Sequence, residues 1–285
     1  MGGLSGIGRR RPRLSDQETE RRMLETAAAA VAEAGLTVSL EHIRLEDVIR
    51  EAGVSRSTVY RRWPQKEMFL GDLLLELARA RAPLSSLGGA EVNDAVRRTV
   101  LERLDLLETA DGRQRLLAEL LRTLAEEDVR RIRASSQWRT YLALTATFVS
   151  LPDGDLRDRV QEELARSEQE FVEAIASSAR AISSMFGLRL RSGVSISYDD
   201  IANLIHAFGR GMVIKTLSAP ELATRRVEGK LYGDAEAWSL SALGLFSVVA
   251  TWLEPDPEIV WDRERIDMVR KQLESEGNLL EAERE

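Results

Sequence analysis

The chain has 285 residues, 44% of them hydrophobic, which is enough for one large or two modest domains with a buried core. It has no cysteine, which excludes disulfides, thiolate metal sites and a cysteine nucleophile. The net charge of −7 is uneven, because residues 1–82 carry 14 Lys and Arg against 12 Asp and Glu, whereas residues 83–285 carry 26 against 35. This asymmetry indicates either a nucleic-acid contact at the N-terminal end or ordinary surface variation.

Residues 1–14 are rich in glycine and arginine and are expected to form a disordered basic arm when free. Such an arm can track phosphates or enter a minor groove, or it can be a solubilising tail. Its arginines are no export signal, because the charged residues 16–22 follow where an apolar core should stand. The apolar run at 240–253 is too short to span a bilayer. We therefore expect a cytoplasmic protein with no membrane partner.

Four helices are predicted next in the chain. A capping box formed by Ser15 and Glu18 opens the first, which runs to Gly35. A short second helix at 45–52 has apolar residues at helical spacing, and Gly53 is its stop.

Ser55 is then the predicted cap of a third helix that ends at Trp63, since Pro64 restricts the residue before it. A fourth helix follows at about 65–82.

The third helix has a basic outer face. Val59 and Trp63 lie one turn apart and are predicted to face the other helices. Ser57 and Arg61 then point outward, and Thr58 and Tyr60 flank them. Arg56 lies in the first turn of the helix and Arg62 at the edge of its outer face. Between Gly53 and Lys66 the chain has four basic residues and no acidic one. This face offers donors for guanine edges and phosphates, and the alternative is a solvated amphipathic helix.

A family resemblance follows from these residues. The pattern Ala52-Gly53-Val54-Ser55-x-x-Thr58-Val59-Tyr60-x-x-Trp63-x-x-Lys66-Glu67 resembles the N-terminal signature of TetR-family transcriptional regulators. With its flanks, from Ala27–Gly35 to Leu74, the match covers about 60 residues. The resemblance implies an all-α homodimer with an N-terminal helix-turn-helix and a helical effector domain. It also implies phosphate contacts from Thr58, Tyr60 and Lys66, and base contacts from Arg56, Ser57 and Arg61.

Two departures from the family pattern concern the start of the second helix. The link from Gly35 is longer than is usual, and Ile43 and Arg44 stand where a hydroxyl cap is common. Arg44 could replace that phosphate contact by its charge, or it could be a solvated arginine. The predicted DNA-binding set is therefore Arg44, Arg56, Ser57, Thr58, Tyr60, Arg61, Arg62 and Lys66.

The rest of the chain reads as nearly all helix. Residues 83–89 break the pattern, and helices are predicted at 90–110, 113–134, 136–151, 156–186, 199–218, 235–253 and 258–275. An extended link is expected at 188–197, Ser197 is a predicted cap, and Asp256-Pro257 is a predicted start of the last helix.

The expected fold is all-α, with four parts along the chain. These are the arm at 1–14, a helix-turn-helix DNA-binding domain at 15–82 (motif about 44–63), a helical-bundle effector-binding and dimerisation domain at 83–257, and a C-terminal helix and tail at 258–285.

The helical body supplies candidates for two further roles. Residues 199–217 and 235–253 are the candidate dimer surface, because the second is apolar over more than one face. Candidate effector-binding residues are Trp138, Tyr141, Phe171, His206 and Arg210, although core packing or hydrogen bonds between helices would also account for them.

The sequence favours no enzyme, catalytic residue, metal or cofactor, because its two histidines and surface acidic pairs assemble no catalytic set. The predicted function is a dimeric regulator that binds double-stranded DNA at a pseudo-palindromic operator, as a repressor released by a small molecule. A ligand-independent regulator and an all-α interaction scaffold without DNA binding are the alternatives.

Overall fold

The computed structural model describes residues 14–34, 40, 43–79, 90–229 and 237–275. It divides into two compact units. The first contains residues up to 80 together with 139–165, and the second contains 81–138 together with 166–285. The predicted arm, the break at 83–89 and the tail beyond 275 lie outside the described residues.

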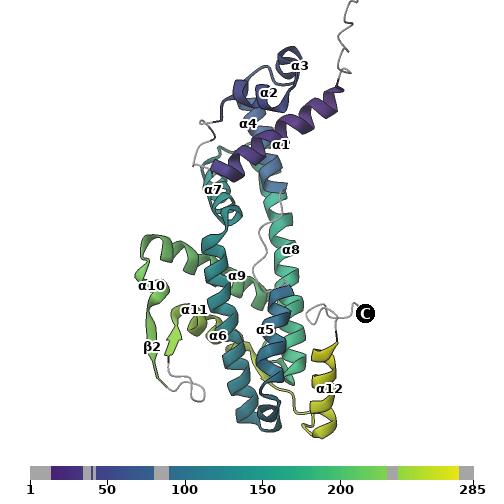
Figure 1. Cartoon of the computed structure of the whole chain (residues 1–285), viewed down its shortest axis with the longest axis vertical. Helices are drawn as coiled ribbons and strands as arrows, with labels where there is room; N and C mark the ends of the chain where they lie inside the picture. Colours follow the sequence, from purple (N-terminus) through teal and green to yellow (C-terminus); the bar gives the residue numbers. More distant parts are fainter. Residues whose placement is uncertain (1–13, 35–39, 41–42, 80–89, 230–236, 276–285) are drawn as a thin grey trace, which may run out of the picture. The chain divides into compact units, whose positions relative to one another are not determined.

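The first unit begins with four helices, α1 (Asp16–Ala34), α2 (Leu45–Ala52), α3 (Arg56–Arg62) and α4 (Lys66–Arg79) (Figure 1). Their apolar faces meet in one core that includes Met23, Val31, Val59, Trp63 and Phe69, all fully buried. The rings of Trp63 and Phe69 pack edge to face, with centroids 5.2 Å apart. The helix-turn-helix predicted from the sequence is thus present.

Local signals set most of these helix ends. The Ser15 hydroxyl accepts a hydrogen bond from the Glu18 N–H at 3.0 Å, as a capping residue should. Gly53 has the left-handed φ of 63° that ends α2, and its N–H donates to carbonyls of the last turn. Ser55 stands at the N-cap of α3, but its hydroxyl bonds the Ser57 hydroxyl at 2.8 Å and caps no N–H. Ser55 is therefore the N-cap residue, as predicted, but its hydroxyl does not make the predicted capping hydrogen bond.

Two later helices contribute to the first unit, α7 (Ser136–Ser150) and the start of α8 (Asp155–Met185). Arg79 Nε donates to Glu163 Oε1 at 3.1 Å, and Gly71 faces the side chain of Leu156. These contacts group residues 139–165 with the N-terminal helices, whereas the sequence placed them within the second domain.

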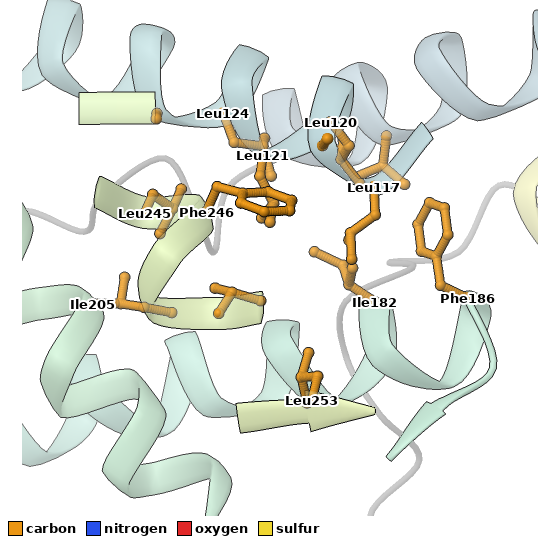
Figure 2. Close-up of a cluster of buried hydrophobic side chains, with 14 of the residues drawn as sticks. Leu117, Leu120, Leu121, Leu124, Ile182, Phe186, Ile205, Leu245, Phe246 and Leu253 are labelled. Carbon is orange, nitrogen blue, oxygen red and sulfur yellow. The ribbon is translucent and has the colours of Figure 1, made fainter. Parts of the chain in front are cut away.

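The second unit is a helical bundle made of α5 (Ala90–Leu101), the 3-10 helix η3 (Leu104–Glu108), α6 (Ala110–Ala134), the rest of α8, α9 (Tyr198–Ser218), α10 (Glu221–Thr224), α11 (Leu240–Trp252) and α12 (Arg263–Glu274) (Figure 1). The central helix is α11, which packs mainly on α6 and α9. Figure 2 shows leucine, isoleucine and phenylalanine side chains from these elements filling the interior. Ser197 and Asp200 form a full capping box at the start of α9, which confirms Ser197 as the cap.

Two short antiparallel pairs accompany the helices. β1 (Leu188–Leu190) pairs with β4 (Leu253–Pro255), and β2 (Arg226–Glu228) pairs with β3 (Ala237–Ser239). Arg189 Nη2 lies 3.0 Å from Glu254 Oε1 in the first pair. The extended link predicted at 188–197 is confirmed at its start, and the all-α class is confirmed for the described chain.

Three predicted helices are shorter than expected. The one at 90–110 breaks after Leu101, because the 3-10 turn buries Leu107 and its carbonyl accepts from Arg113 at 2.8 Å. The one at 235–253 begins at Leu240, where the Ser239 hydroxyl accepts from the Ala242 N–H at 3.1 Å. Residues 235–236 of that prediction lie outside the described part.

The last helix also starts later than predicted. Asp262, and not Asp256, is its N-cap, because the Asp262 carboxylate accepts the Arg265 N–H at 2.9 Å. Asp256 instead accepts the Glu258 N–H at 3.0 Å, two residues on, in a local turn.

Candidate nucleic-acid interface

The short helix α3 presents a polar outer face. Val59 and Trp63 are fully buried, as predicted, and so they fix the rotation of the helix within the first unit. Arg56, Ser57, Tyr60 and Arg61 are then exposed, and Thr58 is half-buried. The helix follows α2 through the Gly53 turn, which is the arrangement that places a second helix in the major groove of DNA.

Carboxylates from outside α3 hold its exposed arginines. Arg56 Nη2 lies 2.6 Å from Glu46 Oε2, and Arg61 is paired with Asp16. Glu46 also accepts a hydrogen bond from the Tyr60 hydroxyl, at 2.7 Å to Oε1. This bond, with a smaller contribution from burial, raises the pKa of Tyr60, so its hydroxyl stays protonated and keeps donating to Glu46.

Arg62 lies differently from the other arginines of the helix. Its Nε donates to Glu20 at 3.0 Å, its Nη2 lies 3.1 Å from Asp72, and its guanidinium carbon is 5.3 Å from the Trp63 ring centroid. The hydrogen bond to Glu20 is the main cause that raises the pKa of Arg62. The structure therefore places Arg62 in a network that links α1, α3 and α4, and a DNA contact from it stays a prediction.

Arg44 and Lys66 stand at helix starts on either side of α3. Arg44 is the exposed N-cap of α2, with extended backbone and no side-chain capping bond. Lys66 is half-buried at the first position of α4. Both positions are compatible with the phosphate contacts predicted for them, because helix N-termini commonly approach the DNA backbone.

The sequence missed the acidic partners of α3. Glu46 lies 14 residues before Tyr60, and Asp16 lies 45 residues before Arg61. The sequence showed an acid-free α3, but no local pattern indicated which distant carboxylates would reach it.

Three of the five predicted effector residues come together in the second unit. The Phe171 and His206 rings pack at an interplanar angle of 56° with centroids 4.4 Å apart, and Glu168 lies against both His206 and Arg210. Burial lowers the pKa of Arg210. Trp138 is buried, and Tyr141 belongs to the other compact unit. Glu168, which the sequence did not single out, is the centre of this cluster.

A separate apolar cavity lies elsewhere in the second unit. Its volume is about 30 Å³, and it is lined mostly by aliphatic side chains such as Leu117, Leu121, Ile175, Ile182, Ile201 and Leu245. Figure 2 shows Leu117, Leu121, Ile182 and Leu245 around this interior. None of the five predicted effector residues lines it. Aliphatic residues at helical spacing indicate core, so nothing in the sequence marks the cavity.

Among the described residues, no group of three or more His, Asp or Glu side chains could hold a metal ion. None of the helices in the described ranges is long and apolar enough to cross a bilayer.

No protein-family model matches the chain. Over 57 residues it is 39% identical to an uncharacterised helix-turn-helix-type transcriptional regulator of Mycobacterium tuberculosis (strain ATCC 25618 / H37Rv), a match that covers 20% of this chain and 28% of the relative. The chain thus spans little more than a quarter of the length of this curated relative.

Solved structures give a broader but weaker likeness. NalD, the secondary repressor of the MexAB-OprM multidrug efflux pump in Pseudomonas aeruginosa, is 20% identical with a TM-score of 0.38, over 85% of this chain and 98% of NalD. A protein from Shewanella sp. PV-4, provisionally described as a TetR-family transcription regulator, is 15% identical with a TM-score of 0.36, over 83% and 98%.

The chain is similar to TetR-family regulators. The likeness to the solved structures is of low identity and low TM-score, whereas the match to the mycobacterial regulator is shorter and has the higher identity.

Proposed function

We propose that this protein is a sequence-specific, double-stranded DNA-binding transcriptional regulator in which α3 is the recognition helix. The observation that carries the proposal is the exposed, acid-free face of α3, held by the buried Val59 and Trp63. A helix of this size with arginine, serine and tyrosine on one side fits the major groove, where arginine pairs with guanine through two hydrogen bonds. The name of the mycobacterial relative, a helix-turn-helix-type transcriptional regulator, supports the same function.

The contacts divide by their place on the unit. Arg56, Ser57 and Arg61 would read base edges from the exposed side of α3, whereas Thr58, Tyr60, Lys66 and Arg44 would hold phosphates. Arg62 would have to break its ion pairs with Glu20 and Asp72 to reach DNA. Of the predicted set, it is therefore the residue with the least support for a DNA contact.

Homodimerisation through α9 and α11 is part of the proposal. One stripe of α9 is exposed at positions 204, 207, 211, 214 and 218, with Leu204 and Ile214 both more than 40% exposed. Next to it, the Phe208 ring sits where a side chain on Gly244 would stand, so α9 and α11 pack closely and can act as one surface. A second copy would cover this stripe and give two recognition helices for a pseudo-palindromic site.

We further propose that a small apolar molecule releases the protein from DNA, as in a ligand-responsive repressor. The aliphatic cavity of the second unit supports this, because its lining offers almost no polar partner. At about 30 Å³ the cavity must enlarge to admit an effector, and this enlargement would couple binding to a change of shape. A ligand-independent regulator predicts that no apolar compound changes DNA affinity.

The test compares two substitutions on a site selected from a random duplex pool. Arg61→Ala should cost about 1–3 kcal/mol on the preferred site and relax the base preference there. Lys66→Ala should weaken binding to all sequences alike and reduce the salt slope by about one. Fluorescence anisotropy over a salt series measures both. Absence of duplex binding, or weak binding whose affinity depends on neither salt nor sequence, would favour the scaffold alternative.

A further inference from the structure

Glu46 is an acid placed at the surface proposed to meet DNA. It lies in the first turn of α2, and its two carboxylate oxygens bind different side chains of α3. Oε2 is 2.6 Å from Arg56 Nη2, and Oε1 accepts the Tyr60 hydroxyl at 2.7 Å. Arg56 and Tyr60 are four residues apart, so one carboxylate spans a full turn of α3.

The geometry leaves the reading edge of Arg56 available. The ion pair with Glu46 involves Nη2, and a guanidinium carries five N–H donors. A guanidinium has two bidentate edges, Nη1 with Nη2 and Nε with Nη2, and Nη2 carries one N–H on each. While Glu46 takes one N–H of Nη2, the other edge can still donate to O6 and N7 of a guanine.

By contrast, if the Arg56 side chain rotates toward a phosphate, its ion pair with Glu46 breaks. Glu46 then lies beside the DNA backbone without this partner. Contact with phosphate is the mode that holds non-specific complexes.

We propose that Glu46 is a specificity-determining residue that positions Arg56 for sequence reading and opposes non-specific phosphate contact. This inference rests on the proposed function. A carboxylate beside DNA is repelled by phosphates in any complex. Only in the specific complex does the retained pair with Arg56 offset that repulsion, so Glu46 raises the ratio of specific to non-specific affinity.

Asp47 supplies a matched control on the same helix. It is acidic, and its side chain is 50% exposed against 46% for Glu46, but its ion pair is with Arg50 of α2 itself, at 2.8 Å. Glu46→Gln and Asp47→Asn thus remove the same charge from neighbouring positions, and only the first removes a charge that is paired with α3. Glutamine also keeps an acceptor for the Tyr60 hydroxyl.

The experiment measures affinity for the selected site, for its single-base variants and for an unrelated duplex. Glu46→Gln should strengthen binding to the unrelated duplex about 3-fold and weaken binding to the selected site about 3-fold, as expected for an exposed ion pair. The specificity ratio then falls about 10-fold. Asp47→Asn should strengthen both modestly and leave the ratio unchanged.

Single-base variants and a double mutant separate positioning from a general structural effect. The base preference lost in Glu46→Gln should be confined to the position that Arg56→Ala also relaxes. In an Arg56→Ala background, Glu46→Gln should no longer change that preference. Relaxation at every position, or equal behaviour of Glu46→Gln and Asp47→Asn, would overturn the inference while sequence-specific binding by the wild type stands. If the wild type itself prefers no sequence, the proposed function fails and this inference fails with it.

Discussion

At the scale of single residues, Asp72 fixes the end of α3. Its Oδ2 accepts the Trp63 indole N–H at 2.8 Å and lies 3.1 Å from Arg62 Nη2. Trp63 is fully buried, so its N–H has no access to water and depends on this acceptor. Loss of the acceptor therefore leaves a buried donor unsatisfied, which is more costly than loss of an exposed ion pair.

We expect Asp72→Ala to lower the free energy of unfolding by about 1–3 kcal/mol, the cost of a buried donor left without a partner. Urea denaturation followed by circular dichroism measures this change. Asp72→Asn is the control, because the amide oxygen can still accept from the Trp63 N–H and should recover most of the loss. Equal destabilisation by the two variants would show that charge on Asp72 matters and the indole hydrogen bond does not.

Burial of single residues was predictable from the sequence, whereas their hydrogen-bond partners were not. Burial of Val59 and Trp63 is predictable because helical periodicity is a local property, and both are buried. The carboxylates Glu46, Asp72 and Glu168 were not predicted as partners, because each binds a side chain of a different helix. The Trp63 and Asp72 pair is separated by 9 residues and the Arg210 and Glu168 pair by 42.

At the scale of elements, the same distinction governs helix ends. The end of α2 at Gly53 and the start of α9 at Ser197 are predictable from residues whose backbone or hydroxyl chemistry acts within a few positions. The break after Leu101 accompanies burial of Leu107, which depends on the packed bundle, so helical periodicity in the sequence continues through it. The start of α11 does have a local signal, the Ser239 cap, but Ser239 lies within a run whose apolar residues continue on both sides.

The turn between α2 and α3 gives a prediction at this scale. Gly53 has a φ of 63°, and a Cβ added there would meet no other atom within 4 Å, so only backbone conformation opposes substitution. Gly53→Ala should lower the free energy of unfolding by about 1–2 kcal/mol. Gly53→Asn should cost less, since asparagine tolerates the left-handed region. Chemical denaturation of both variants measures the difference, and an alanine variant as stable as the wild type would contradict the prediction.

At the scale of the whole molecule, the chain forms two compact units whose members are not contiguous in sequence. Segmentation by composition places one boundary near residue 82 and cannot show that 139–165 belongs with the N-terminal helices. The same limit affects the effector set, since Tyr141 falls in one unit and His206 in the other. Aromatic residues are conspicuous in a sequence, whereas the cavity is lined mostly by aliphatic residues.

Dimerisation of the molecule can be tested at the exposed stripe of α9. Ile214 lies within the exposed stripe of α9 and is 49% exposed in the single chain. If a second copy covers this stripe, Ile214→Glu places a carboxylate in an apolar contact without a partner, and it does so twice in a symmetric dimer. We expect the dimer dissociation constant to rise at least about 100-fold, as measured by sedimentation equilibrium.

Met268→Glu is the matched control for assembly, because Met268 is similarly exposed, at 52%, but lies on α12 of the same unit. Neither variant should change the thermal transition of the folded unit much, since both side chains face outward. Ile214→Glu alone should lose affinity for the full pseudo-palindrome while it keeps weak binding to a single half-site, because each recognition helix is intact and only the link between two copies is broken. A dimer that persists in Ile214→Glu but dissociates in Met268→Glu would move the interface from α9 to α12.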